Sequence, residues 1–275
     1  DVVERLAAVD TVIFDKTGTL TESRAALVDF AFAEGTDDRA ALRRAIAAVQ
    51  RAADHPVAAA FHALAGGGDV RTVAVENLTI LPGRGVAATC RTGGAGMRLV
   101  IGSERILETD VQQADWHSLR GRLAGVDRGR AVLVLADGRL AAGGVVDEQP
   151  LANARPALEE LRELGLRREL LTGDTQRRAD GWPVEAVVAG LLPDGKVHHV
   201  RGRRGEGRCV LFVGDGVNDA PAMAEADIAV AVGAGAPLAL ASADLILVEP
   251  RLGRIPHAIE FCRRARATIR SNLRL

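Results

Sequence analysis

The sequence predicts an α/β fold built on a mainly parallel sheet, with an α+β domain inserted into it. The first observation is the run Thr11–Phe14, which is β-branched or aromatic and has the pattern of a buried strand. The second is the alternation of strand and helix patterns after Asp147, which is typical of a parallel sheet. The third is the stretch from about residue 23 to 143, where short strand patterns, glycine turns and helical segments follow one another.

The chain opens with helical spacing over Val2–Val9 and then enters the Thr11–Phe14 strand. The elements expected in the insert are a helix capped by Asp37 or Asp38 and running through Val49, a helical segment at Pro56–Ala65, short strands between Val70 and Gly102, a helix near Trp116–Ala124, and the strands Ala131–Ala136 and Leu140–Val146. The dipeptide Asp137-Gly138 predicts a hairpin between the last two strands.

The second half of the chain returns to the pattern of a parallel sheet. The elements expected there are helix Ala154–Leu164, strands Arg168–Leu171 and Ala186–Ala189, helix Lys196–Arg201, strands Cys209–Val213, Ile228–Val232 and Leu245–Val248, and a final helix over about Ile255–Arg270. Arginines are dense on the final helix, which predicts either a solvated surface helix or a segment close to a membrane.

Three polar motifs each follow a predicted strand. They are Asp15-Lys16-Thr17-Gly18-Thr19-Leu20-Thr21, Thr172-Gly173-Asp174 and Gly214-Asp215-Gly216-Val217-Asn218-Asp219. An aspartate at the carboxyl end of a parallel strand can attack a phosphoryl group if a metal ion and a lysine neutralise the negative charge. A lone aspartate there is more often a turn cap, but the five-residue string from Asp15 to Thr19 arises by chance in only about one sequence in ten thousand of this length.

These motifs resemble the three phosphorylation-domain motifs of P-type ATPases, in the order that this family has. The resemblance implies a haloacid-dehalogenase-like Rossmannoid core, ATP as the phosphoryl donor, Mg2+ as the cofactor, and a transport path elsewhere. It also implies a phosphorylation domain made of residues 1–22 and 144–275 and a nucleotide-binding domain made of residues 23–143.

The resemblance assigns roles to individual residues. Asp15 is the nucleophile with Lys16 beside it, and Mg2+ is ligated by Asp15, Asp215 and a backbone carbonyl near Thr17. Thr172 and Gly173 contact the phosphate, and Asp174 contacts the ribose or the metal. Lys196 neutralises charge, and Asn218 and Asp219 orient the phosphate and the metal shell.

The residue at position 17, Thr17, distinguishes the pump hypothesis from that of a soluble phosphatase. Soluble phosphatases of the same superfamily have a second aspartate at this place, which acts as general acid and then as base for water. Without that carboxylate, loss of the acyl-phosphate is expected to slow by about 10² to 10⁴. A persistent phosphoenzyme suits a pump, which changes conformation before it dephosphorylates.

The insert resembles the nucleotide-binding domain of the heavy-metal branch of the family. The resemblance rests on Asp54-His55-Pro56 and on Pro82-Gly83-Arg84-Gly85-Val86. It implies an ATP site that includes Gln50, His55, Gly83, Gly85 and Ser103. Gln50 stands where the branch has glutamate and Ser103 where it usually has asparagine, so both departures are expected to weaken ATP binding.

Composition excludes several other classes of protein. A formal charge of −1 argues against a nucleic-acid binder, and three scattered cysteines indicate neither a disulfide framework nor a metal site. The longest uncharged run, Ile228–Ala243, is too short and too rich in glycine to span a bilayer. The four residues His117, His198, His199 and His257 are expected at the surface. The early position of Asp15 and the missing initiator Met indicate a soluble piece of a longer protein.

The interpretation that combines these features is the cytoplasmic, autophosphorylating part of a heavy-metal P-type ATPase in a bacterial plasma membrane. Its expected partners are ATP, the protein's own transmembrane and actuator domains, and a transported cation held by membrane helices, with copper ahead of zinc or cadmium. Two alternatives stay open: a soluble haloacid-dehalogenase-like phosphatase with a cap domain, and a non-catalytic nucleotide-sensing module.

Overall fold

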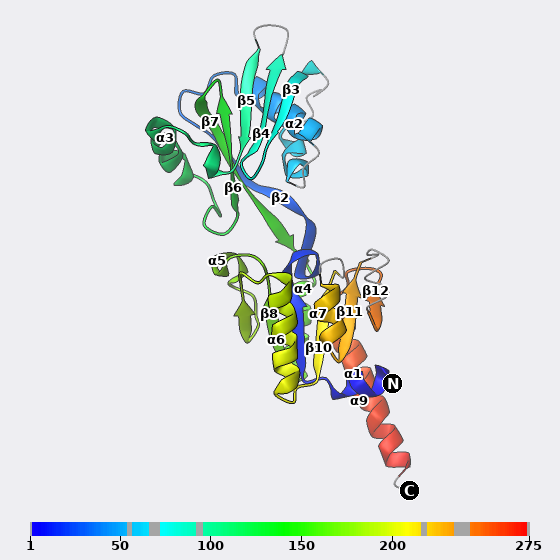
Figure 1. Ribbon diagram of the computed structural model, residues 1–275. Coiled ribbons are helices and arrows are strands. Elements are labelled where there is room, and N and C mark those ends of the chain that lie inside the picture. Colours follow the sequence, from blue (N-terminus) through cyan, green and yellow to red (C-terminus); the bar gives the residue numbers. More distant parts are fainter. Residues whose placement is uncertain are drawn as a thin grey trace. The chain divides into compact units, whose positions relative to one another are not determined.

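The computed structural model describes residues 2–53, 57–65, 72–91, 96–215, 219–233 and 243–273. The chain divides into two compact units, the first made of Asp1–Ser23 with Pro150–Leu275 and the second of Arg24–Gln149 (Figure 1). The sequence places the end of the insert at residue 143. The second unit extends to Gln149 because strand β7 (Arg139–Pro150) continues without a break to that point.

A parallel sheet of six strands forms the centre of the first unit, as the sequence predicts. Its strand order is β12-β11-β10-β1-β8-β9, and all neighbouring strands are parallel. The strands are β1 (Thr11–Asp15), β8 (Arg167–Leu171), β9 (Ala186–Val188), β10 (Val210–Gly214), β11 (Ile228–Val232) and β12 (Leu245–Leu247). The strand β1 therefore lies inside the sheet, between two strands from the second half of the sequence.

Helices cover both faces of this sheet (Figure 1). They are α1 (Val2–Ala8), α4 (Ala154–Glu163), α5 (Gln176–Ala179), α6 (Pro193–Gly205), α7 (Ala220–Glu225) and α9 (Arg254–Asn272). Because side chains alternate along a strand, Val12 and Phe14 pack on the face with α1, α4 and α9, whereas Ile13 packs on the face with α6 and α7. Both faces of β1 are buried, and each of its large apolar side chains contributes about 1.5 to 3 kcal/mol by burial.

The second unit contains a six-stranded sheet in the order β2-β7-β6-β5-β4-β3, in which the pairs from β3 to β7 are antiparallel. Its strands besides β7 are β2 (Thr21–Phe32), β3 (Ala74–Leu81), β4 (Gly85–Arg91), β5 (Met97–Gly102) and β6 (Arg130–Ala136). Asp137 and Gly138 both have positive φ, at 47° and 81°, which is the conformation that a two-residue hairpin turn needs.

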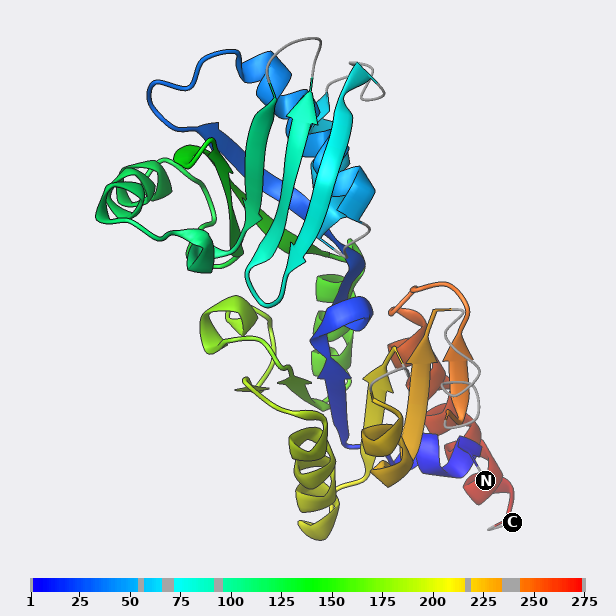
Figure 2. The same cartoon turned by 45° about the horizontal axis from the view of Figure 1, so that its top comes forward.

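Helical segments pack on both faces of the second sheet. The segments are α2 (Arg39–Ala53), η2 (Ala58–Ala65), η4 (Glu104–Ile106) and α3 (Asp110–Arg120). Ile46 and Phe61 join α2 and η2 to one face, and Trp116 joins α3 to the other (Figures 1 and 2). Asp38 accepts a hydrogen bond from the Ala41 amide at 3.0 Å, so the cap expected for α2 is present.

Two elements of the second unit differ from the sequence expectations. β2 was not expected, because its exposed and half-buried residues give little hydrophobic pattern. α3 begins at Asp110, before the expected start near Trp116, because Thr109 and Gln112 form a capping box. Within the described residues, no helix combines the length and the apolar composition that crossing a membrane requires.

Candidate active site

The three polar motifs meet at one edge of the first unit's sheet. Asp15 is the last residue of β1, Asp215 directly follows β10, and Thr172 directly follows β8. Since these three strands are parallel neighbours, their carboxyl ends lie side by side. Asp15 is only 6% exposed and Thr172 only 2%. The arrangement is the one in which parallel sheets carry their chemistry.

Lys196 joins two of the carboxylates in this site. Pro193 starts α6, and Lys196 lies in the first turn of that helix. Its Nζ donates to Asp15 Oδ1 at 2.6 Å and to Asp219 Oδ1 at 2.7 Å. The side chain is 12% exposed, so the ammonium group is largely withdrawn from water. The lysine that the sequence selected therefore contacts the candidate nucleophile.

The site carries more negative charge than Lys196 compensates. The pKa of Asp15 is raised to about 7, mainly by burial and to a smaller extent by the carboxylate of Asp219. Lys196 lowers this pKa and so acts in the opposite direction. Burial also raises the pKa of Asp219, to which the nearby Asp215 contributes. Asp219 Oδ2 is buried without a hydrogen-bond partner. An unpartnered carboxylate oxygen among three aspartates fits a site for a hard cation such as Mg2+.

The segment Lys16–Leu20, labelled η1, is an irregular turn with non-helical backbone angles at Thr17 and Gly18, and it brings the first motif back toward Asp215. Gly18 has φ 73°, a conformation that favours glycine, and a Cβ atom there would lie 3.4 Å from Asp215 Oδ2. Thr17 is exposed in an extended conformation. The backbone amide of Lys16 hydrogen-bonds the carboxylate of Asp15 and helps to keep it ionised.

Asp174 lies between two cations. Its carboxylate accepts from the ammonium group of Lys16, which is buried, and from the guanidinium group of Arg178. The backbone amide of Asp174 donates to Thr172 Oγ1 at 3.1 Å, which fixes the turn after β8. A Cβ atom at Gly173 would lie 3.2 Å from the carbonyl oxygen of Leu191, so the turn has little room for a side chain there. Sequence reasoning missed Arg178, although its spacing of four residues from Asp174 on a short helix was a usable signal.

The distribution of lysine supports a chemical role for this site. The 35 Lys and Arg residues of the chain include two lysines, Lys16 and Lys196, and both are in the site. An ammonium group is a compact point charge, whereas a guanidinium group is a planar fork that needs more space. Lysine therefore stands where a cation must fit between closely spaced carboxylates.

A separate cavity of about 750 Å³ lies in the second unit. Its walls include Gln50, Gly83, Gly85 and Ser103, four of the five residues expected at the nucleotide. Further wall residues, which the sequence did not indicate, include Val57, Ile80, Ile101, Arg105, Arg130 and Val132. Cavities of this size with apolar walls and a few polar groups are typical of small-molecule sites.

Glycine at the cavity is a steric requirement. A Cβ atom at Gly85, where φ is 152°, would lie 2.1 Å from the carbonyl oxygen of Ile101. Gln50 is 6% exposed and is one of the residues that line the cavity. The Ser103 hydroxyl lies 3.4 Å from the carbonyl oxygen of Arg84.

The remaining predicted residues divide into three groups. Asn218 and His55 lie outside the described residues. His117, His198 and His257 are exposed, as expected. The expectation of a surface position is wrong for His199, because its ring is half-buried and lies 2.6 Å from the buried carboxylate of Glu169.

A comparison with family profiles agrees with this geometry. The profile described as haloacid dehalogenase-like hydrolase matches residues 9–227. The chain belongs to this family. Curated proteins to which this haloacid dehalogenase-like chain is similar include copper-transporting ATPases. It is 35% identical over 99% of its length to copper-transporting ATPase 2 of Rhizobium meliloti (strain 1021), and 34% identical over 99% to a probable copper-exporting P-type ATPase V of Mycobacterium tuberculosis (strain ATCC 25618 / H37Rv).

Solved structures of pumps share the fold of this haloacid dehalogenase-like chain. A zinc-transporting PIB-type ATPase in its E2.Pi state superposes with a TM-score of 0.82 at 31% identity, covering 98% of this chain and 43% of the other. The catalytic domain of the CPx-ATPase CopB-B superposes with a TM-score of 0.70 at 27% identity, covering 94% of this chain and 92% of the other. The expected fold class and the resemblance to heavy-metal P-type ATPases are confirmed. The chain spans about a third of the length of the curated relatives that it matches.

Proposed function

We propose that this chain is the ATP-binding and autophosphorylating part of a heavy-metal-transporting P-type ATPase, and that Asp15 receives the γ-phosphoryl group of ATP. The observation that carries the proposal is the bridge from Lys196 to Asp15 and Asp219 at the edge of the parallel sheet. The first unit then acts as the phosphorylation domain and the second as the nucleotide-binding domain.

In the proposed reaction, an ionised carboxylate oxygen of Asp15 forms a bond to the γ-phosphorus. The bond from that phosphorus to the β–γ bridging oxygen breaks, and ADP leaves with the electron pair. Lys196 favours the ionised form of Asp15 and offsets the negative charge that gathers in the transition state. Asp219 holds the lysine from the other side. Thr172 and the Gly173 amide are proposed to donate to the phosphoryl oxygens, and Asp174, with Lys16, to border the site.

Asp15, Asp215 and a backbone carbonyl near Thr17 are proposed to hold Mg2+. When bound, this ion supplies charge neutralisation for the phosphoryl oxygens. The described residues contain no group of three or more His, Cys, Asp and Glu side chains arranged as a metal site. A Mg2+ site needs fewer protein carboxylates than that, since the ion keeps waters and takes oxygen atoms from the substrate.

The direct test of this function is labelling with γ-³²P-ATP and Mg2+. The chain is expected to take up acid-stable label that hydroxylamine releases, because hydroxylamine cleaves acyl-phosphates and leaves phosphoserine and phosphothreonine intact. Binding of ATP with no incorporation of this kind would contradict the proposal and favour a nucleotide-sensing module. Rapid turnover of small phosphate esters would instead favour a soluble phosphatase.

Thr17→Asp tests why the phosphoenzyme persists. An added carboxylate two residues after the nucleophile can act as a base toward water, so the acyl-phosphate is expected to decay about 10²-fold faster or more. The lifetime of the acid-quenched phosphoenzyme after an ATP chase measures this change, with Thr17→Asn as the control of similar size and no charge. A wild-type lifetime of milliseconds, unchanged in Thr17→Asp, would show that Thr17 does not set the decay rate.

Gln50→Glu tests the proposed nucleotide site in the second unit. A glutamate carboxylate can accept a charge-assisted hydrogen bond from the adenine amino group, which contributes about 1.5 to 3 kcal/mol against about 0.5 to 1.5 for the neutral amide. We expect Gln50→Glu to tighten ATP binding about threefold to tenfold. Calorimetric titration measures the change, with Gln113→Glu on the exposed face of α3 as the control. Equal affinity in all three proteins would place the adenine elsewhere.

Copper is the proposed cargo, because the curated relatives named above are copper-transporting or copper-exporting ATPases. Zinc is the second candidate, since a zinc-transporting ATPase shares the fold. The proposal places the chain on the cytoplasmic side of a membrane, with transmembrane and actuator domains of the same protein as its partners. ATPase activity of the complete protein, measured with each metal in turn, decides between the two ions.

A further inference from the structure

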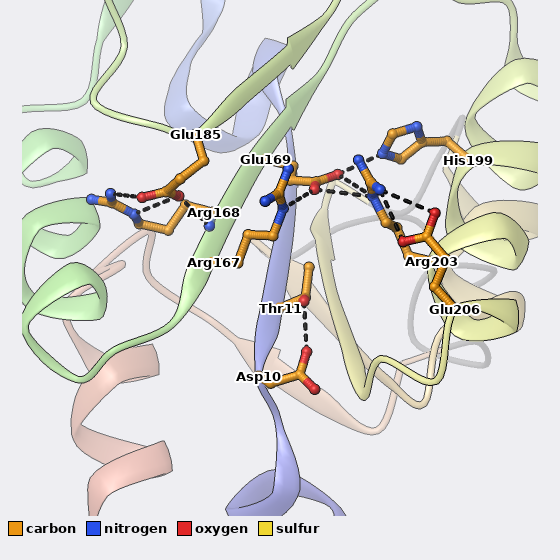
Figure 3. Close-up of polar contacts among 9 residues, drawn as sticks. All are labelled: Asp10, Thr11, Arg167, Arg168, Glu169, Glu185, His199, Arg203 and Glu206. Atoms are coloured by element: carbon orange, nitrogen blue, oxygen red, sulfur yellow. Dashed lines mark hydrogen bonds and ion pairs between the residues drawn. The ribbon is translucent and has the colours of Figure 1, made fainter.

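A cluster of charged side chains from β8 and α6 surrounds a buried glutamate in the middle of β8 (Figure 3). Its centre is Glu169, which has no exposed surface. His199 Nε2 lies 2.6 Å from Glu169 Oε2, Arg203 Nε donates at 3.0 Å, and Arg167 Nε donates to Glu169 Oε1 at 2.5 Å. Arg203 also donates to Glu206 at 3.0 Å.

The carboxylate of Glu169 is ionised in this setting. Burial alone would raise its pKa, but hydrogen bonds from His199, Arg167 and Arg203 lower the pKa to about 2. An ionised carboxylate only accepts hydrogen bonds, so Nε2 of His199 carries a proton. An apolar side chain could pack at this position of the sheet, because the residue beside Glu169 on β1 is the apolar Ile13. A buried charge here is therefore not required for packing.

The cluster joins β8 to the helix that carries Lys196. Lys196, His199 and Arg203 are spaced at i, i+3 and i+7, so they share one face of α6. The first contacts Asp15 and Asp219, and the other two contact Glu169. The hydrophobic anchor of α6 is small: Val200 is buried, and Val197 is half-buried against the same core. The position of α6 on the sheet thus depends strongly on its polar contacts.

We propose that Glu169 is a positioning residue for phosphoryl transfer: through His199 and Arg203 its carboxylate fixes α6, and thereby holds Lys196 Nζ against Asp15 and Asp219. The catalytic consequence rests on the proposed function, whereas the placement of Lys196 can be measured without ATP. A shift of about 1 Å in a group of this kind can lower a rate by about 10²-fold.

The opposite face of β8 offers a matched control. Arg168 is buried there, pairs with Glu185 and donates to the carbonyl oxygen of Leu158 at 2.9 Å. Arg168 lies on the same strand as Glu169 and binds α4 and not α6, and its partner Glu185 directly precedes β9. Glu185→Gln therefore weakens an ion pair of a buried arginine, whose carboxylate partner is partly exposed, without touching the helix of Lys196.

The experiment uses the two lysines as reporters. Reductive methylation of the folded chain, read by mass spectrometry of the two lysine peptides, measures how firmly each ammonium group is held. In Glu169→Gln and His199→Ala, Lys196 is expected to react about tenfold faster, a factor consistent with the loss of a charge-assisted hydrogen bond. Lys16 is expected to react at its wild-type rate in both variants. His199→Gln keeps a donor near the position of Nε2 and is expected to restore protection of Lys196.

A second readout is the rate of phosphoenzyme formation. Glu169→Gln is expected to lower the rate at saturating ATP by about tenfold or more and to leave the KM for ATP unchanged, because the nucleotide cavity is in the other unit. Glu185→Gln is expected to lower the melting temperature while both lysine reactivity and rate stay unchanged.

The outcomes separate the two proposals. If Glu169→Gln and His199→Ala only lower the melting temperature, as Glu185→Gln does, and Lys196 stays protected, the positioning role is wrong. If Lys196 is released in both variants but the wild type forms no phosphoenzyme, the positioning role stands and the proposed function fails. If Glu169→Gln does not fold, the comparison of His199→Ala with His199→Gln decides the question alone.

Discussion

Asp15→Asn is expected to abolish phosphoenzyme formation and to make the chain harder to unfold. The first effect follows because an amide cannot form the acyl-phosphate. The second follows from the charge in the site, where burial and Asp219 raise the pKa of Asp15 from 3.8 to about 7. Lys196 keeps a carboxylate partner in the variant, since it also contacts Asp219. Asparagine thus removes a charge that the folded state tolerates poorly.

The pH dependence of this effect has a definite sign. A carboxyl group whose pKa is raised on folding favours the folded state at low pH, and this contribution is lost as pH rises from about 4 through about 7. The gain in the free energy of unfolding for Asp15→Asn is therefore expected to be largest above pH 7, on the order of 2 kcal/mol, and to shrink toward pH 4. Urea denaturation with EDTA present measures it.

The control for this prediction is Asp115→Asn, which removes an exposed carboxylate from α3. It is expected to change neither labelling nor stability by a measurable amount. A variant Asp15→Asn that is less stable than the wild type at pH 8 would contradict the description of the site as overloaded with negative charge. Labelling of Asp15→Asn at the wild-type level would contradict the assignment of the nucleophile.

Lys196→Ala is expected to slow phosphoenzyme formation by about 10² to 10³, the range found when a preorganised electrostatic partner is removed from a transition state. Lys196→Arg is expected to recover little of this loss, because the guanidinium fork does not fit a space that Nζ fills at 2.6 Å and 2.7 Å from two carboxylates. The KM for ATP is expected to stay unchanged. Rapid-quench kinetics at saturating ATP measure the rate.

Arg201→Ala is the matched control for Lys196. It removes an exposed cation of α6 that pairs with Glu225, so the rate of phosphoenzyme formation is expected to stay at the wild-type value. If Lys196→Ala also keeps the wild-type rate, the bridge between Asp15 and Asp219 has no role in the chemistry, and the mechanism loses its main support.

The centre of the fold and the main motifs could be predicted because their signals are local. β1 is a continuous hydrophobic run, and the residue that follows a buried strand must emerge at the sheet's edge. Lys196 was found through its motif, and the structure places its ammonium group on Asp15. Four of the residues that the sequence assigned to the nucleotide line one cavity. Two of them, Gly83 and Gly85, belong to a glycine motif, and Gly85 marks the close approach of β4 and β5.

Other features could not be predicted because they depend on contacts between distant residues. Arg167, Arg168 and Glu169 form a polar string in the sequence, and no periodicity indicates that Glu169 is buried. Its partners His199 and Arg203 come from another element, α6, and become neighbours only when that helix packs on the sheet. The strand β2 was not predicted, because its half-exposed residues do not alternate between apolar and polar.

The most direct measurement is the identification of the phosphorylated residue. Acid-quenched phosphoenzyme, made from ATP and Mg2+, is reduced with borohydride, which converts an aspartyl-phosphate to homoserine at the modified position. Mass spectrometry of the peptides is expected to find homoserine at position 15 and none at Asp174, Asp215 or Asp219. Homoserine at one of those three positions, or labelled protein in which Asp15 is intact, would contradict the proposal that Asp15 is the nucleophile.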